Sequence, residues 1–552
     1  MMRSRRATYP QVDPRAAGEV TAPVREVPAD LSIAEAQTLM LEQAVPYLAA
    51  RLGERVGLVD RRSVEQAMAW DLGKHPVAIA LWLDVPLVNA GAPEVRLRRW
   101  LLRRPQVLVG GTGRWLGVAE QQSPVTLSHV ARTELNRLPV DVQKLLARVG
   151  KAGDDIGGSV AVVGGAVRDL LLGAREVDLD LAVEGDGLEF ARRLGRQLRA
   201  GVTVHSAFLT TRLTLPGGRT VDVATARREH YRAPGALPRV RVGTLLDDLR
   251  RRDFTINAMA LLLNAPRYGF VEDPLGGVED LRRRLLRVIH PLSFIEDPTR
   301  VFRAARFEVR LGLRLTPGTR HLALRAMALD VYHPQAFRRL GAELTLLVGE
   351  KDPPAVFRAL ERLGALRLLT QSVRPRHRLL SSVKATLTWY ARRGRIVGES
   401  ALPLYLLGLT QGLSDAEVTA LVDRLGLGSM KRPMEESRGA ADTILRIASR
   451  STRASQVTLG LRPFSEMSLL WALARARGRA RGNLRRYLQT LRHARPGLTG
   501  EDLKRMGIPP GPTYRYLLDS LLAAMVDGRV ASRRQEARFV RELLKLKLTR
   551  QR

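Results

Sequence analysis

Residues 160–182 read VAVVGGAVRDLLLGAREVDLDLA, and this stretch decides the fold. A β-branched run, 160–163, ends in a double glycine, and an apolar helical run follows at 168–172. The next run, 177–181, alternates carboxylates with apolar side chains, which is the period of a β-strand. Strand, turn, helix and strand in so short a span predict a sheet with helices packed on it.

Short strand-like runs continue outward from this stretch. VTVHS, TTRLTL and RTVDVAT are bounded by turn residues, and the helical run LEFARRLGRQLRA precedes them. Upstream, LPVDVQKLLARVGKAGDDIGG has the apolar spacing of a helix. The sequence therefore predicts an α+β head domain over residues 129–290.

The rest of the chain has three further kinds of sequence. From residue 291 onward, apolar positions recur at three- and four-residue spacing, as in AVFRALERLGAL, and predict an all-helical C-terminal region with parts at 291–380 and 381–552. Residues 31–128 mix helical and strand-like pieces and predict a small α/β extension. Residues 1–30 are rich in Pro, Arg and Ala and predict a disordered basic leader.

Composition narrows the classes of function. The 552 residues include 90 Lys and Arg against 55 Asp and Glu, and this net charge of +35 favours a polyanionic partner. Arg outnumbers Lys, so an arginine-rich genome is an alternative source of the charge. The absence of cysteine excludes disulfides and thiolate sites, and no apolar run is long enough to span a membrane. We expect a cytoplasmic protein without a membrane partner.

The double glycine marks a candidate phosphate site. Gly164 and Gly165 follow a strand and open a helix, so backbone amides there can approach a phosphate. Arg168 could add a fork of donors. An ordinary tight turn is the alternative for this motif taken alone.

Asp178 and Asp180 form a candidate metal site. Residues i and i+2 of a strand face the same side, so both carboxylates project together while Leu179 faces the core. Two such carboxylates repel each other unless a cation lies between them, and Mg²⁺ prefers one or two carboxylates with phosphate and water. Asp222, in RTVDVAT, joins them if its strand is their neighbour, and such a trio suits two-metal phosphoryl transfer. A solvated strand face is the alternative.

The stretch RRDFTINA combines arginines with a carboxylate and an amide. Arg252 could meet triphosphate charge. Asp253 and Asn257 are four residues apart on an expected helix, so they share a face and could contact a ribose hydroxyl. An ordinary helix start is the alternative.

The stretch EDPTR places Asp297 before a proline, which predicts a helix N-cap. Arg300 lies three residues on, and Arg303 and Arg306 continue an arginine row along one helical face. A carboxylate beside a guanidinium can read the hydrogen-bonding edge of a base, whereas capping alone is the alternative for Asp297.

Taken in order, VVGGAVRDLLLG, VDLDLAVEGD, RRDFTINAMA and EDPTRVFRAARF resemble the motifs of the class II tRNA nucleotidyltransferase and bacterial poly(A) polymerase family. The resemblance covers about residues 158–320. It implies a polymerase-β-type nucleotidyltransferase head, a helical neck that selects the nucleotide (291–380), and a helical body and tail that bind tRNA (381–552). VEGDGLEF and HYRAPGALP are similar to a branch with an N-terminal CBS-like extension, here 31–128.

The resemblance also implies roles for the motif residues. Asp178 and Asp180 would be the catalytic carboxylates that hold Mg²⁺, and Asp222 is the candidate for a third. The other residues would bind the nucleotide: Gly164, Gly165 and Arg168 at the triphosphate, Arg252, Asp253 and Asn257 at the ribose, Asp297 and Arg300 at the base, and Arg303 and Arg306 at the triphosphate or in helix packing.

The implied activity is addition of nucleotides of the 3′-terminal CCA to tRNA from CTP or ATP, with release of pyrophosphate. The implied partners are the tRNA acceptor arm and the nucleoside triphosphate. We favour addition of A alone, beside a separate CC-adding enzyme. A CC-adding enzyme, a complete CCA-adding enzyme and a poly(A) polymerase are alternatives, and a non-catalytic RNA-binding protein is disfavoured because both Asp178 and Asp180 are present.

Overall fold

The computed structural model describes residues 22–111, 114–121, 126–127, 132–205, 209–393 and 401–549. The chain forms two compact units, one of residues 1–343 and 359–368 and the other of 344–358 and 369–552. The first unit is mixed α and β and the second is helical, which confirms the predicted fold class. Within the described ranges, no helix is long and apolar enough to cross a membrane.

An eight-stranded sheet forms the centre of the head domain, where the short β-branched runs predict strands. The strand order is β10-β11-β12-β9-β8-β15-β16-β7. Strands β9 and β12 run parallel, and the other neighbours run antiparallel. The bounds are β7 Thr126–Leu127, β8 Val160–Val163, β9 Leu179–Val183, β10 Gly201–His205, β11 Thr210–Thr214, β12 Thr220–Thr225, β15 Ala260–Leu262 and β16 Val271–Glu272.

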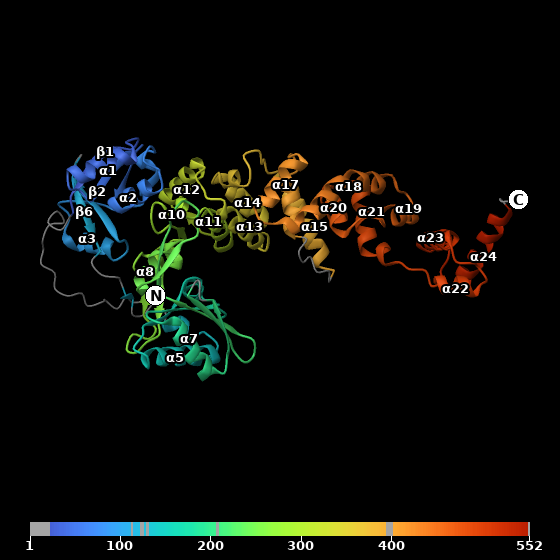
Figure 1. Cartoon of the computed structure of the whole chain (residues 1–552), viewed down its shortest axis with the longest axis horizontal. Helices are drawn as coiled ribbons and strands as arrows, with labels where there is room; N and C mark the ends of the chain where they lie inside the picture. The colour runs from blue at the N-terminus through green and yellow to red at the C-terminus, as the bar shows by residue number, and fades with distance from the viewer. Residues whose placement is uncertain are drawn as a thin grey trace, which may run out of the picture. The chain divides into compact units, whose positions relative to one another are not determined.

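Both faces of this sheet are buried in its middle. Val160 and Val162 of β8 belong to one core cluster, whereas Ala161 and Val163 belong to another, because side chains alternate along a strand. Figure 1 shows α5 and α7 close together in the head domain, and both contribute to the first cluster. The head helices are α4 Arg132–Leu135, α5 Val140–Asp154, α6 Gly165–Leu171, α7 Gly187–Leu198, α8 Leu245–Arg250 and α9 Gly277–Arg282.

The N-terminal extension contains the same βαββ unit twice. In each copy the first strand pairs parallel with the second, and the second pairs antiparallel with the third. The first copy is β1 Val24–Pro28, α1 Ile33–Glu42, β2 Tyr47–Leu52 and β3 Arg55–Asp60; the second is β4 Leu87–Asn89, α3 Glu94–Leu101, β5 Gln106–Gly111 and β6 Arg114–Glu120. Between them lie α2 Arg61–Ala69 and η2 Val77–Ala80.

The prediction of a disordered leader over residues 1–30 is wrong for the last part of that range. Strand β1, VREVP, has two adjacent charges between its valines and no apolar run, but pairing with β2 makes it part of the first βαββ unit. Residues 1–21 lie outside the described part of the chain.

Helices of the neck complete the first unit. A two-stranded sheet, β13 Arg227–His230 with β14 Arg239–Val242, and the short pair β17 Leu285–Leu286 and β18 Arg314–Leu315 accompany them. The helices are α10 Ser293–Glu296, α11 Thr299–Leu311, α12 Pro317–Leu329, α13 Gln335–Val348 and α14 Pro353–Arg362; the last two cross the boundary between the units.

The second unit is a run of helices. α18 packs on α20 and α21, and α22 to α24 close a separate small core around Leu503 and Leu521. The bounds are α15 His377–Ala391, α16 Ala401–Leu409, α17 Asp415–Arg424, α18 Lys431–Arg450, α19 Ala454–Leu461, α20 Glu466–Arg475, α21 Gly478–Gln489, α22 Gly500–Arg505, α23 Pro512–Val526 and α24 Arg533–Thr549. The predicted helical periodicity is confirmed.

Candidate active site

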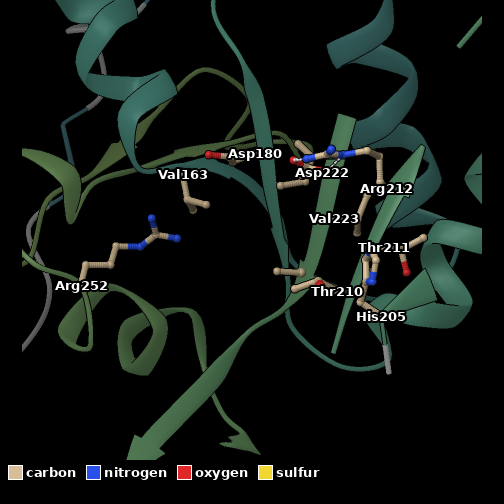
Figure 2. A pocket seen from close by; sticks show the side chains of 11 residues that line it. Val163, Asp180, His205, Thr210, Thr211, Arg212, Asp222, Val223 and Arg252 are labelled. Carbon is tan, nitrogen blue, oxygen red and sulfur yellow. Dashed lines mark hydrogen bonds and ion pairs between the residues drawn. The ribbon is translucent and has the colours of Figure 1, made fainter. Parts of the chain in front are cut away.

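A cavity of about 330 Å³ opens on the head sheet beside β9, β11 and β12. Figure 2 shows Asp180 and Asp222 on one side of this cavity and Arg252 pointing into it from another side. His205 and Arg212 also line it. Four of these five side chains can carry charge at neutral pH, so the cavity is suited to a charged ligand rather than an apolar one.

The carboxylates meet through the parallel pairing of two strands. Asp222 lies directly opposite Asp180 in the register of β12 and β9, which confirms the predicted neighbourhood of the two strands. Asp178 precedes β9, and both Asp178 and Asp180 are exposed while Leu179 is buried. Although the Asp180 side chain is open to the cavity, surrounding protein atoms replace part of its water, and this desolvation, with repulsion from Asp222 and Asp178, raises its pKa, while Arg252 and Arg212 oppose the rise.

These carboxylates fit a divalent cation that also binds phosphate. Like charges at facing strand positions favour a cation between them, and all of the donors are oxygen atoms. Across the described residues, no group of three or more His, Cys, Asp or Glu side chains could hold a metal ion by itself. Carboxylate oxygens of this kind suit a divalent cation whose remaining ligands come from phosphate and water.

Arg212 is a site residue that the sequence analysis did not single out. Its Nε and Nη2 donate to the two carboxylate oxygens of Asp222 at 2.7 and 2.8 Å. The two residues are opposite one another on β11 and β12. The only signal in TTRLTL is that Arg212 occupies an outward-facing position of an alternating strand, and its partner depends on strand pairing.

The predicted glycine turn lies next to Arg252. Gly164 is the N-cap of α6 with φ of +74°, a backbone conformation that favours glycine. A Cβ on Gly164 would lie 2.5 Å from Nη1 of Arg252. The positive φ favours glycine, a Cβ there would also displace the Arg252 guanidinium, and the two predicted phosphate-binding motifs come together.

Arg168, Asn257 and Asp253 form a buried chain of hydrogen bonds. Arg168 donates to Asn257 Oδ1 at 2.6 Å, and Asn257 Nδ2 donates to Asp253 Oδ1 at 2.9 Å. Arg168 also pairs with Asp169, so its guanidinium is held inside the protein rather than presented as an open fork. The expected α-helix is in fact a 3-10 turn, η4 Thr255–Asn257, yet the contact between Asp253 and Asn257 is present.

Arg303 holds the other oxygen of Asp253. Its Nε donates to Asp253 Oδ2 at 2.7 Å. Burial raises the pKa of Asp253, but Arg303 and the Asn257 amide together keep this pKa below its ordinary value. The ring of Phe307, which the sequence analysis also missed, lies 5.1 Å from the Arg168 guanidinium and 5.4 Å from that of Arg303. Arg306 pairs instead with Glu343, at 2.9 Å.

Asp297 and Arg300 have different partners in the structure. Arg300 is buried and donates to Ser293 Oγ at 2.8 Å and to Glu296 at 3.2 Å. Asp297 accepts from Arg339 Nη1 at 2.7 Å, a residue that the sequence analysis missed. The N-cap of α11 is Pro298 rather than Asp297, although Asp297 accepts the first-turn amide of Thr299 at 3.0 Å.

The chain is similar to proteins that extend tRNA. The Poly A polymerase head domain family matches residues 160–287. An A-adding tRNA nucleotidyltransferase of Geobacter sulfurreducens is 33% identical over 95% of this chain, which spans 64% of that relative. A CC-adding tRNA nucleotidyltransferase of Deinococcus radiodurans is 34% identical over 71% of this chain and 91% of its own. The Thermotoga maritima CCA-adding enzyme, solved with tRNA, is 29% identical with a TM-score of 0.64, over 76% of this chain and 99% of that one.

Proposed function

This chain belongs to the tRNA nucleotidyltransferase family, and we propose that within this family it adds the terminal A to tRNAs that end in CC. The Geobacter relative that aligns with 95% of this chain is an A-adding enzyme, which supports this choice. The observation that carries the chemistry is the position of Asp222 opposite Asp180, with Arg252 across the same cavity.

The proposed reaction forms a bond between the tRNA 3′ oxygen and the α-phosphorus of ATP and breaks the bond to the β-phosphate oxygen, so pyrophosphate leaves. Asp178 and Asp180, with Asp222 beside them, would hold Mg²⁺, which when bound lowers the pKa of the attacking hydroxyl and neutralises phosphate charge. Arg252 provides a fixed positive charge for the triphosphate beside the glycine turn of Gly164.

Nucleotide recognition is assigned to the polar chain behind the glycine turn. Asp253 and Asn257 would bind the ribose, because Arg303 and Arg168 hold both side chains in place. Asp297 and Arg300 remain our candidates for reading the base. Arg339 donates to one oxygen of Asp297 and Thr299 to the other, so this carboxylate has a fixed orientation, from which it would accept a hydrogen bond from a base amino group.

CC addition is the second candidate, favoured by the Deinococcus relative, of which this chain covers 91%. For an A-adding enzyme, the cytoplasm would also contain a separate CC-adding enzyme that supplies its substrate. Both candidates use the same carboxylates, so they differ in nucleotide choice rather than in phosphoryl chemistry.

The test is extension of three tRNA transcripts, which end before CCA, after C and after CC, with ATP, CTP or both and Mg²⁺. A single A added to the transcript ending in CC supports the proposal. Two Cs and a stop, all three nucleotides, or a long A tail would identify a CC-adding enzyme, a complete CCA-adding enzyme or a poly(A) polymerase. No extension of any transcript would overturn the proposed reaction.

A further inference from the structure

The N-terminal extension contacts the nucleotide-binding part of the chain through a buried arginine. Arg104, between α3 and β5, is 8% exposed, and its Nη2 donates to Asp280 of α9, which is 0% exposed. Its Nη1 donates to the carbonyl of Gly276 at 3.2 Å. The backbones are so close that a Cβ on Gly276 would lie 1.9 Å from the carbonyl oxygen of Arg103.

Asp280 connects this arginine to the turn that carries Asn257. Thr255, the first residue of η4, donates from Oγ1 to Asp280 Oδ2 at 2.8 Å. Its backbone amide donates to the carbonyl of Arg287 at 2.9 Å, and the side chain of Arg287 pairs with Asp280 at 3.1 Å. One buried carboxylate therefore binds Arg104 of the extension, Arg287 of the head and the turn that begins two residues before Asn257.

A second contact reaches the same network from another residue of the extension. Asp84 forms an ion pair with Arg287 at 3.0 Å and accepts the Gly318 amide, at the start of α12, at 3.1 Å. A Cβ on Gly318 would lie 2.6 Å from the carboxylate carbon of Asp84. Arg287 thus pairs with Asp84 of the extension and with Asp280 of the head. The packing of Asp84 against Gly318 is too close for a loosely tethered domain.

A third contact of the extension, made by Trp70, is connected by hydrogen bonds to Arg251, which is next to the cavity residue Arg252. The indole of Trp70 donates to the carbonyl of Tyr231 at 3.0 Å, and both side chains are buried. The Tyr231 hydroxyl donates to Glu229 at 3.1 Å, and Glu229 accepts from Arg251 at 2.9 Å. Arg251 directly precedes Arg252, which lines the cavity.

We propose that the N-terminal extension is a fixed part of the nucleotide site and that Arg104 is a positioning residue, which acts through Asp280 and Thr255 on Asn257. This inference rests on the proposed function for the identity of the nucleotide. A buried carboxylate needs its partners, so loss of Arg104 leaves Asp280 free to shift toward Arg287 and to release Thr255. The turn η4, which carries Asn257, then loses its fixed position.

The test compares Arg104→Met, Arg104→Lys and Thr255→Val in the full chain. Arg104→Met is expected to raise the Kd for ATP, and the KM for ATP in transfer, about tenfold, since small misplacements at such sites are costly. The KM for tRNA and kcat at saturating ATP should stay within about threefold. Arg104→Lys should recover part of the loss, and Arg99→Met, an exposed arginine of the same extension, should change nothing.

The double variant separates positioning from general loss of stability. If both residues act along one route, Arg104→Met with Thr255→Val should raise the Kd for ATP no more than the worse single variant. Additive losses, or an unchanged Kd in Arg104→Met, would overturn the proposal. If Arg104→Met does not fold, an unchanged Kd in Thr255→Val overturns it equally. Because ATP binding is measured by equilibrium dialysis without transfer, failure of the proposed reaction remains distinguishable.

Discussion

Asp180 and Asp222 lie opposite one another on two parallel strands, with Arg212 bonded to the second and Arg252 across the cavity. The two carboxylates repel, and the pKa of Asp180 is raised by partial loss of water around its side chain and by its acidic neighbours. A cation that lies between them removes this repulsion. The register of β9 and β12 thus sets the geometry of the proposed metal site.

Replacing Asp178 or Asp180 with Ala should lower single-turnover transfer by at least about a hundredfold, because the metal provides much of the charge stabilisation. The tRNA affinity should change less than about twofold, since phosphate contacts lie elsewhere. Extension gels and filter binding measure the two quantities. Asp155→Ala, an exposed acid at the end of α5, is the control. Unchanged transfer in both variants would refute the metal assignment.

Gly164→Ala should weaken binding of ATP about tenfold or more, because a Cβ there displaces the guanidinium of Arg252 and strains a positive φ. Gly173→Ala is a matched control, since Gly173 has φ of +86° but nothing within 4 Å of its Cβ position. Both variants should lose thermal stability from backbone strain at a positive φ, and Gly164→Ala alone should lose ATP affinity. Equal ATP affinities in the two variants would contradict a role for Arg252 at this turn.

Asp273 should make stability depend on pH. Burial, opposed by the amides of Val278 and Gly277, raises its pKa from 3.8 to about 6. Between about pH 4 and 6, the folded chain therefore keeps a proton on Asp273 that the unfolded chain releases. The protonated carboxyl contributes to the free energy of unfolding fully below pH 4, and this contribution is lost as pH rises to 6. The shift corresponds to roughly 3 kcal/mol. In Asp273→Asn, the fall in denaturation midpoint from pH 4.5 to 6.5 should be smaller than in the parent chain; an equal fall would place the titration elsewhere.

Arg481 and Arg485 of α21 should contribute to RNA affinity through phosphate contacts. Arg485 lies 5.3 Å from the ring of Trp389, and burial, ahead of repulsion from Arg481 and Arg393, lowers the pKa of Arg485. Replacing Arg481 and Arg485 with Ala should reduce the slope of log K against log salt for tRNA by about 1.5, at roughly 0.7 to 0.9 for each contact. Arg432→Ala, an exposed arginine paired with Glu436, is the control and should leave the slope unchanged. An unchanged slope in the double variant would exclude Arg481 and Arg485 from the RNA-binding surface.

Local pattern predicted five strands of the head sheet, but β7, β15 and β16 were not singled out. VDLDLAV and RTVDVAT alternate with a period of two, and both form strands, because this period is a property of the extended chain itself. The glycine turn at Gly164 also follows from its position between an apolar run and a helix. The first βαββ strand was missed because VREVP has no apolar run, and its pairing with β2 is not visible in local sequence.

Partners of charged residues could not be predicted in the same way. Spacing suggests that Arg300 lies beside Asp297, yet Arg300 binds Glu296 and Asp297 binds Arg339 from another helix. Burial determines these partners, because a buried guanidinium must form hydrogen bonds with the acceptors that the packed helices place beside it. Sequence distance contains no such information.

By itself, the sequence determined which residues carry charge, which runs form strands and where the chain turns, because these depend on local geometry. Only the tertiary structure decided that Asp222 faces Asp180, and that Arg104 and Asp280 meet across 176 residues of chain. Strand register and buried ion pairs depend on how separate elements pack, and burial then makes each such pairing costly to change.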